Sequence, residues 1–411
     1  MAEITRHRCR LLRSRPGWFI VAILVCEAFL LFSQRFKWFP FNAHKGWGVL
    51  IAMACMGMFF VVFFLWFTAA LLFRWQFQFS VRSLLSLFVV AAVPLGWLAA
   101  EMKAAERHAD AVRWIRTAHR DGGCHYDWEC DAQGRSMSST KTPPATRGLR
   151  NLLGDDFFAD VVYVGFADVD PPIPARDLEH LKCLTRVKRA EFNDSGVTDA
   201  GLEHLKGMKE LECLTLIHNH ITDAGLRSLE GLAELRVLNL DENRMAGPGL
   251  EHLRGLTKLR ELYLERMPIT GAGLKFLNGL TQLEVLKFNE THITDADLEQ
   301  INGLTNLRRL SLTKTRITSN GLKHLNRMTQ LQVLCLNHTD VGDDGINHLK
   351  ALSQLRQLGL SHSRVTDAGV KHLKCLKQLR YVDLRGTAVT WSGGSELSKA
   401  IGPELDVWTR P

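Results

Sequence analysis

A repeat of 24 residues runs through the second half of this 411-residue chain and restricts the folds that the chain can adopt. The pattern L-x-x-L-x-L, with valine or phenylalanine in place of one leucine in two copies, begins at Leu211, Leu235, Leu259, Leu283, Leu307, Leu331, Leu355 and Leu379. VKRAEF at Val187 is one more copy on the same period, and VVYVGF, from Val161, is a degenerate first copy. Repeats of this length indicate units that stack, because a single unit cannot close its own apolar core.

The second half of the unit recurs as well. The sequence ITDAGL begins at Ile221, and close variants begin at Val197, Ile269, Ile293 and Val365. We expect the threonine of this motif to cap a short helix, with the aspartate in the first turn, where a negative charge is favourable. The leucines of L-x-x-L-x-L are expected to point inward from a parallel sheet, and the residues between them to point outward.

Over about residues 160–410 these motifs resemble the leucine-rich repeat family, at its short, cysteine-type or ribonuclease-inhibitor-like end. The resemblance implies an α/β fold, a curved leucine-rich repeat solenoid with a parallel sheet. It also implies a binding function, and it names no ligand. We predict that residues 151–411 form this solenoid with N-terminal and C-terminal caps, the last strand being PELDVW, from Pro403.

A small polar side chain recurs three residues after the last apolar residue of each L-x-x-L-x-L copy. The position holds Ser195, Asn219, Asn243, Met267, Thr291, Thr315, Thr339, Ser363 and Thr387. A hydrogen-bonding side chain there can tie the backbone of adjacent turns, and in the family it forms an internal ladder. Met267 interrupts the series, which predicts a locally irregular turn.

The first hundred residues predict an all-α transmembrane anchor. Residues 47–73 contain no charged side chain over 27 positions, and about 20 apolar residues suffice to cross a bilayer. Residues 18–32 and 83–100 are further candidate spans, so residues 1–100 are predicted to hold about three transmembrane helices in contact with membrane lipids. The alternatives are a buried soluble helix for the second segment and a cleaved signal peptide for the first. Solenoid repeats on a short multi-span anchor resemble uncharacterised bacterial leucine-rich repeat membrane proteins.

The predicted location is a bacterial inner membrane with the repeats outside the cytoplasm. The basic residues that precede the first candidate span are Arg6, Arg8, Arg10, Arg13 and Arg15. Basic residues before a first span favour a cytoplasmic N-terminus, and three spans would then place the repeats on the other side. Glu27 is the one charged residue within a candidate span, which leaves a role in transport or signalling as an alternative.

Residues 101–150 predict a helical connector, a short strand and a polar loop. The segment CHYDWEC places Cys124, Tyr126, Trp128 and Cys130 on one side of an extended strand. On a straight strand the two cysteines would lie about 20 Å apart, too far for a disulfide without a turn between them.

The charge distribution argues against nucleic acid as a partner. The whole chain carries a net charge of +8, but residues 1–150 account for +10 and residues 151–411 for −2. The basic excess therefore flanks the apolar segments, and the repeat region is nearly neutral. Nucleic-acid binding needs a basic surface on the binding domain itself.

The repeats contain no recognisable catalytic motif, so we predict a protein that is not an enzyme and uses no cofactor or metal. One histidine register lies on the expected convex helices: His180, His204, His252, His324, His348 and His372. We interpret this row as recurrent surface chemistry, with metal binding as the alternative. His338 and His362 share another register in adjacent repeats, where a metal or pH-sensing pair is the alternative reading.

The outward positions of the strands are the predicted binding surface. They carry mixed charges in the central repeats and an arginine excess towards the C-terminus, and tyrosine and arginine are common binding anchors. The candidate partner-binding residues are Arg236, Arg260, Glu261, Tyr263, Glu265, Arg308, Arg309, Arg356, Arg380 and Tyr381. An unidentified protein or peptide is the predicted partner, bound on the concave face. A non-protein ligand such as a glycan, or a regulatory role in a membrane signalling or transport unit, is the alternative. The oligomeric state is left open.

Overall fold

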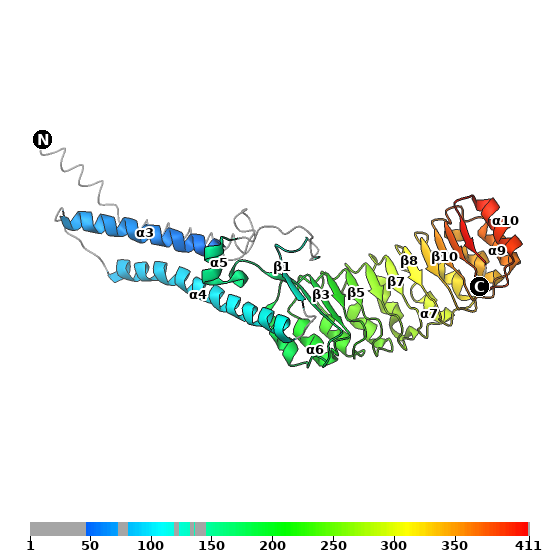
Figure 1. Cartoon of the computed structure of the whole chain (residues 1–411), viewed down its shortest axis with the longest axis horizontal. Helices are drawn as coiled ribbons and strands as arrows, with labels where there is room; N and C mark the ends of the chain where they lie inside the picture. Colours follow the sequence, from blue (N-terminus) through cyan, green and yellow to red (C-terminus); the bar gives the residue numbers. More distant parts are fainter. Residues whose placement is uncertain (1–46, 73–80, 119–122, 132–134, 136–144, 410–411) are drawn as a thin grey trace, which may run out of the picture. The chain divides into compact units, whose positions relative to one another are not determined.

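The computed structural model describes residues 47–72, 81–118, 123–131, 135 and 145–409. Contacts divide the chain into two compact units. The first unit combines Met1–Asp110 with Ser139–Asp160, and the second combines Ala111–Ser138 with Val161–Pro411. Both are drawn in Figure 1.

The first unit is helical. Its elements are α3 (Trp47–Leu72), the first part of α4 (Val81–Ala118), α5 (Arg147–Leu153) and the 3₁₀ helix η2 (Asp155–Phe157). Val49, Ala105, Phe157 and Phe158 form a buried cluster, and Trp47 lies 6.1 Å from Phe158 between ring centroids. The short segment that precedes the repeats is therefore packed against both long helices.

The structure describes two of the three candidate membrane spans. Residues 18–32 lie outside the described residues, whereas residues 47–72 form α3 and residues 83–100 lie within α4. Helix α4 continues through Pro94 to Ala118, so it includes most of the predicted connector helix. Within the described part of the chain, no helix has the length and apolarity needed to cross a membrane. The predicted transmembrane anchor is therefore not supported by the structure.

The second unit contains the predicted solenoid. Its described residues include a 12-stranded sheet in sequence order, in which β1 pairs antiparallel with β2 and the later pairs are parallel. The strands are β1 (Gly123–Tyr126), β2 (Val161–Ala167), β3 (Arg189–Asn193), β4 (Cys213–Thr215), β5 (Val237–Asn239), β6 (Glu261–Tyr263), β7 (Val285–Lys287), β8 (Arg309–Ser311), β9 (Val333–Cys335), β10 (Gln357–Gly359), β11 (Tyr381–Asp383) and β12 (Asp406–Trp408). The parallel α/β solenoid expected from the repeat is confirmed.

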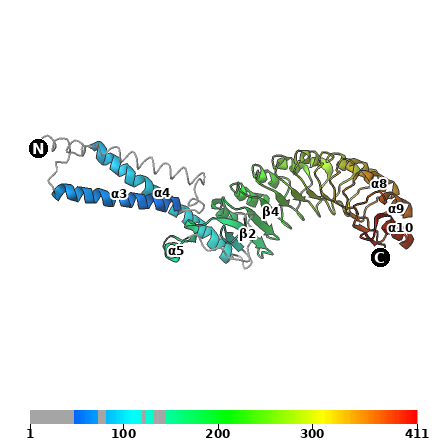
Figure 2. The ribbon, with the colours of Figure 1, turned by 90° about the horizontal axis from the view of Figure 1, so that it is seen from above.

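Short helices cover the opposite face of this sheet. The α-helices are α6 (Asp199–Leu202), α7 (Asp295–Glu299), α8 (Asp343–His348), α9 (Asp367–Leu373) and α10 (Trp391–Ile401). The 3₁₀ helices are η3 (Asp177–Cys183), η4 (Glu203–Leu205), η5 (Gly225–Leu229), η6 (Pro248–Leu253), η7 (Gly271–Gly279), η8 (Gly321–Leu325) and η9 (Leu349–Ala351). Figure 2 shows the strands along the inner, concave edge of the repeats and the helices along the outer, convex edge.

The core is a stack of leucines with a period of 24 residues. In β6 and its flanks, Leu259, Leu262 and Leu264 are fully buried, and Leu262 is in register with Leu238 and Leu286. The residues between the leucines face outward, as predicted. Each repeat therefore buries its apolar side against two neighbours, which makes stacking the source of stability.

The predicted ladder of polar side chains is present in the N-terminal repeats. The Asn219 amide oxygen accepts a hydrogen bond from the backbone N–H of Val197 at 2.8 Å, and its amide nitrogen donates to the Phe192 carbonyl. Asn243 bonds the preceding repeat in the same way, through Ile221 and Leu216. These side chains connect adjacent repeats.

The ladder changes where threonine replaces asparagine. The hydroxyls of Thr291, Thr315, Thr339 and Thr387 each donate to a carbonyl three residues earlier in their own repeat, at 2.6 Å. The prediction that these residues tie adjacent turns is therefore wrong, because the shorter threonine side chain closes its own turn instead. Met267 is buried at this position.

Adjacent repeats are also joined by a contact that the sequence reasoning missed. The carboxylate of Asp199 accepts hydrogen bonds from the N–H and the hydroxyl of Thr222, at 2.9 and 2.6 Å. A Cβ at Gly225 would overlap with this carboxylate. The same arrangement joins Asp295 to Thr318, Asp343 to Thr366 and Asp367 to Thr390. The aspartate and the glycine of the repeated motif thus meet across the boundary between repeats.

The segment CHYDWEC does not form the predicted extended strand. Strand β1 ends at Tyr126, and the chain then turns, with the backbone N–H of Tyr126 donating to the Glu129 carboxylate at 2.9 Å. Cys124 and Cys130 are both buried and no disulfide joins them. Strand β1 instead covers the N-terminal edge of the sheet, which would otherwise expose unpaired backbone groups.

Candidate binding surface on the concave sheet

The concave face is built from the third and fifth positions of each L-x-x-L-x-L copy and from the residue that directly follows the copy. Parallel strands lie about 4.8 Å apart, so side chains at equal positions of neighbouring repeats touch one another. The surface is therefore a set of rows, each with one residue per repeat, along the inner edge seen in Figure 2.

A hydrogen-bonded group around Tyr263 occupies the middle of this face. We call Asp241, Glu261, Tyr263, Glu265 and Lys287 the central cluster. The Tyr263 hydroxyl donates to Glu261 at 2.5 Å, and the Lys287 ammonium lies 4.9 Å from the centroid of the tyrosine ring. Lys287 is also 3.7 Å from the Glu265 carboxylate. The predicted residues Glu261, Tyr263 and Glu265 therefore form one connected group.

Two groups of the central cluster titrate far from their ordinary values. Burial raises the pKa of the Asp241 carboxyl to about 6, and the nearby Glu265 charge adds to this effect. The backbone N–H of Glu265 donates to Asp241 at 2.7 Å and partly offsets the rise. Burial and the hydrogen bond to Glu261 raise the pKa of Tyr263 as well. Asp241 therefore changes its charge near neutral pH, where a cation on a partner would favour the ionised form.

Most of the predicted arginines lie at the second position of their repeats, one residue before a strand begins. Several already pair with acidic neighbours. Arg236 lies 3.4 Å from Glu212, and both Arg260 and Arg308 lie 3.5 Å from Glu284. Exposed ion pairs of this kind contribute little to stability, so they are free to exchange partners on binding.

The remaining predicted arginines differ in their partners. Arg380 lies 2.5 Å from Glu404. Arg309, the first residue of β8, and Arg356 are exposed and make no ion pair with a described residue. Of the predicted arginines, these two are therefore the ones that a partner could pair without displacing an ion pair between described residues.

A second aromatic group, which we call the C-terminal cluster, contains Tyr381, Asp383, Arg385, Asp406 and Trp408. Tyr381 and Trp408 meet edge to face at 5.9 Å, and the Arg385 guanidinium lies 4.8 Å from the centroid of the Trp408 ring. Two hydrogen bonds of 2.8 Å join Arg385 to Asp383, and they hold the pKa of that carboxyl below its usual value. Sequence reasoning identified Tyr381 and missed Trp408, although Trp408 belongs to PELDVW, the segment that was predicted to form the last strand.

A third group lies at the N-terminal end. The Tyr163 hydroxyl donates to Glu191 at 3.2 Å, and Arg189 donates to the same carboxylate at 2.6 Å. Burial, followed by the Glu191 charge, raises the pKa of Tyr163 to about 12. Gly165 leaves room for the tyrosine side chain, because a Cβ there would overlap with its ring. Sequence reasoning missed Tyr163 because this residue lies in the degenerate first copy of the repeat.

Small side chains separate the central and C-terminal clusters. Ser311, Cys335 and Gly359 follow one another at the fifth position of consecutive repeats. The Ser311 hydroxyl donates to Asn289 at 2.6 Å, and the Ser361 hydroxyl donates to Asn337 at 3.0 Å. Both hydroxyls therefore have hydrogen-bond partners within the sheet. The small side chains of Ser311, Cys335 and Gly359 form a shallow strip between the two aromatic clusters, which we call the low strip.

His338 and His362 lie beside this face in a row of left-handed residues, at φ 53° and 55°. Their rings stack 4.3 Å apart with an interplanar angle of 12°. Burial and the nearby charges of His362 and Lys314 lower the pKa of His338. Other neighbours in the row form ion pairs, such as Lys314 with Glu290 at 3.0 Å. Among the described residues, no group of three or more His, Cys, Asp or Glu side chains is placed to hold a metal.

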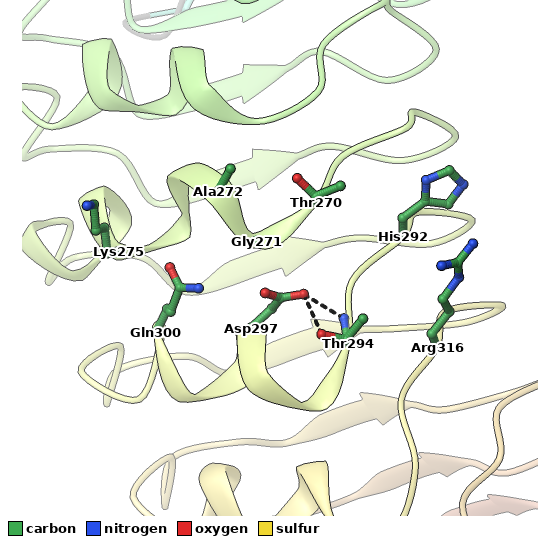
Figure 3. A pocket seen from close by; sticks show the side chains of 9 residues that line it. All are labelled: Thr270, Gly271, Ala272, Lys275, His292, Thr294, Asp297, Gln300 and Arg316. Carbon is green, nitrogen blue, oxygen red and sulfur yellow. Dashed lines mark hydrogen bonds between the residues drawn. The ribbon is translucent and has the colours of Figure 1, made fainter.

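A separate depression of about 610 Å³ lies on the flank of the solenoid, where the chain leaves the strands and enters the helices (Figure 3). Its lining is mainly polar and comes from three consecutive repeats. The lining residues are Thr270, Gly271, Ala272, Lys275, His292, Thr294, Asp297, Gln300 and Arg316. None of the predicted partner-binding residues contributes to it.

The stacked parallel strands and their leucine core define a leucine-rich-repeat solenoid, a class whose members generally mediate protein–protein interaction. Residues 303–325 match the family model described as Leucine Rich repeat. No curated protein matches the chain. The cysteine-type or ribonuclease-inhibitor-like form of the repeat stays a prediction.

Two solved structures from Listeria monocytogenes strain 4b F2365 are similar to this chain. Internalin C2 shares 21% sequence identity, with a TM-score of 0.38, and the match covers 62% of this chain and 86% of the internalin. The internalin inlF shares 16% identity, with a TM-score of 0.44, over 64% of this chain and 93% of its own.

Proposed function

We propose that the solenoid binds a protein partner on its concave face. The observation that carries this proposal is the pair of preorganised aromatic groups, the central and C-terminal clusters, on either side of a low strip. Tyrosine, tryptophan and arginine are the residue types that dominate binding energy at protein interfaces. Their side chains are already held by hydrogen bonds and ring contacts, which reduces the entropy lost when a partner binds.

The charges of the surface suggest the chemistry of that partner. The central cluster holds three carboxylates and one lysine, whereas Arg309 and Arg356 present unpaired positive charge further along the sheet. A partner with a basic group opposite Asp241 and acidic groups opposite the arginines would be complementary. Such an arrangement also sets the direction in which an extended segment lies across the strands.

Site-specific crosslinking in the full-length chain tests this proposal. A photoreactive phenylalanine analogue in place of Tyr263 or Tyr381 should capture one discrete partner, whereas the same analogue in place of Lys323, on convex helix η8, should not. Arg309→Glu should reduce the captured amount, and Lys323→Glu should leave it unchanged. Equal capture from both faces, or capture that is insensitive to Arg309→Glu, would contradict binding at the concave sheet.

A glycan is the second candidate, and the C-terminal cluster is the observation that favours it. Trp408 is 43% exposed and is flanked by Tyr381 and Arg385, so part of its ring is open for stacking. A glycan array probed with the full-length chain and with Trp408→Ala tests this alternative. Binding of a defined sugar that Trp408→Ala abolishes would replace the protein-binding proposal.

The cellular location and the absence of catalysis are also proposals. We infer a binding protein without enzymatic activity that is held at a bacterial membrane, with the repeats outside the cytoplasm. The apolar composition of the first hundred residues supports the membrane location. Retention of the chain in alkali-washed membranes, and digestion of the repeats by protease added to spheroplasts, are the expected results. Release by alkali would contradict anchoring, and protection from protease would reverse the predicted side.

A further inference from the structure

The repeats are joined differently at the boundary between η7 and α7 than at the boundary that follows, between α7 and η8. Gly271 stands where most repeats have aspartate, and Asp297 stands where the following repeat normally has glycine. A Cβ at Gly271 would overlap with the Asp297 carboxylate. The two residue types of the inter-repeat contact have therefore exchanged places, and the carboxylate still occupies the space beside the glycine.

This exchange removes a connection between neighbouring repeats. The Asp297 carboxylate accepts hydrogen bonds from the N–H and the hydroxyl of Thr294, both at 2.8 Å, within its own repeat. At the next boundary, Thr318 makes the equivalent bonds to Asp295 of the preceding repeat. Gly271 offers no such acceptor, and the depression of about 610 Å³ opens above it.

The depression carries more positive than negative charge, because Lys275 and Arg316 line it together with a single carboxylate, Asp297. Lys275, His292 and Arg316 line it, are exposed, and form no ion pair with a described residue. The lining carboxylate, Asp297, accepts two hydrogen bonds from Thr294, keeps its negative charge and forms no ion pair with a described residue. By contrast Arg364, two repeats beyond Arg316 in the same register, lies 2.7 Å from Asp340.

The cations are distributed around the depression rather than gathered at one point. Figure 3 shows Lys275 on one side, His292 and Arg316 on the other, and Thr294 with Asp297 between them. A compact anion would meet one side alone. An extended ligand with carboxylates at both ends would meet both sides, while Gln300 and Thr270 could bond its backbone.

We propose that this depression binds an acidic peptide segment through Lys275, Arg316 and, when protonated, His292. The site lies on the flank of the solenoid and shares no residue with the central or C-terminal cluster. Its existence is therefore independent of the proposed concave interface, and a full-length chain that lacks one site retains the other.

Fluorescence anisotropy with a labelled hexaglutamate peptide and the full-length chain tests this proposal. Saturable binding is expected, and Lys275→Ala/Arg316→Ala should weaken it about tenfold, because both ends of the peptide lose a countercharge. The matched control Lys323→Ala/Arg364→Ala removes the same charge from the same two registers outside the depression, and should change the affinity less than about twofold. Absence of saturable binding, or equal losses in the two double variants, would overturn the proposal.

Competition against a compact anion gives a second test that leaves the chain unchanged. Displacement of the peptide by inorganic phosphate at matched ionic strength would also overturn the proposal, because it would indicate a site for a single compact anion.

Discussion

At the scale of single residues, the aspartate and glycine of the repeated motif act as a pair. Asp199 and Gly225 lie 26 positions apart, in adjacent repeats, and the carboxylate occupies the space that any larger side chain would need. Sequence reasoning placed the aspartate in the first turn of its own helix, where Asp199 does lie, and its hydrogen bonds to Thr222 give it a second role. The glycine is therefore required by close approach rather than by backbone conformation.

Gly225→Ala should accordingly destabilise the solenoid by about 1–3 kcal/mol, because the added methyl group displaces the Asp199 carboxylate from Thr222. Gly255→Ala is the matched control, since a Cβ there meets nothing within 4 Å. Denaturant unfolding monitored by circular dichroism measures the difference. Similar unfolding midpoints for both variants would contradict the packing role of Gly225.

Asp241 predicts a pH dependence that follows from its raised pKa. The folded state holds the proton up to about pH 6, whereas the unfolded carboxyl loses it near its ordinary value of 3.8. Stability should therefore fall as the pH rises from about 4 to 6, and the loss should persist above that window. Part of the carboxyl is exposed, so we expect a loss of about 2 kcal/mol.

Unfolding of the wild type and Asp241→Asn at pH 4, 5, 6 and 7 measures this effect. The variant cannot ionise, so the difference between the two proteins should change across the window and become constant above it. A difference that does not change between pH 4 and 7 would mean that Asp241 titrates at its ordinary value. The Glu265 N–H bonds the Asp241 carboxylate, so the amide at residue 265 also reports the titration by NMR.

At the scale of the elements, two kinds of turn follow the strands. Asn219 makes hydrogen bonds to Ser195, Val197, Phe192 and Ile217, and so joins two repeats. Thr339 makes one, to Leu336 of its own repeat. The periodic position was evident in the sequence, but the reach of each side chain decides whether it connects repeats or closes a single turn.

Asn219→Ala should therefore cost about 3 kcal/mol, because it leaves several buried backbone groups of two repeats without a partner. Thr339→Ala removes one hydrogen bond and should cost about 1 kcal/mol. The free energies of unfolding of the two variants, measured under the same conditions, test the distinction. Equal costs would indicate that the asparagine bonds across the boundary add nothing to stacking.

At the scale of the whole repeat unit, the free energy of unfolding is the sum of the intrinsic stability of each repeat and the interaction energy at each boundary between repeats. The boundary with the weakest interaction is therefore expected to open first. The boundary between η7 and α7 lacks the carboxylate contact that joins α7 to η8. Amide hydrogen exchange should therefore be faster over residues 271–300 than over residues 319–348, where Ser319 bonds Gly342 at 2.9 Å.

Mass spectrometry after deuterium labelling measures this difference peptide by peptide. Gly271→Asp/Asp297→Gly should slow exchange over residues 271–300 and leave residues 319–348 unchanged, since it restores the missing contact at one boundary alone. Uniform protection along the wild-type solenoid would show that the leucine core, rather than the polar contacts at the flank, sets the local stability.

The period of 24 residues was sufficient to predict the parallel sheet, the leucine core and the outward rows, because burial of a periodic apolar pattern is a local property of each unit. It placed Glu261, Tyr263 and Glu265 together, since they lie at alternate positions of one repeat. Contacts between residues about 24 positions apart depend on how far each side chain reaches across the stack. The Arg385 contact with Trp408, the Asp199 contact with Gly225 and the depression above Gly271 were therefore decided by the tertiary structure.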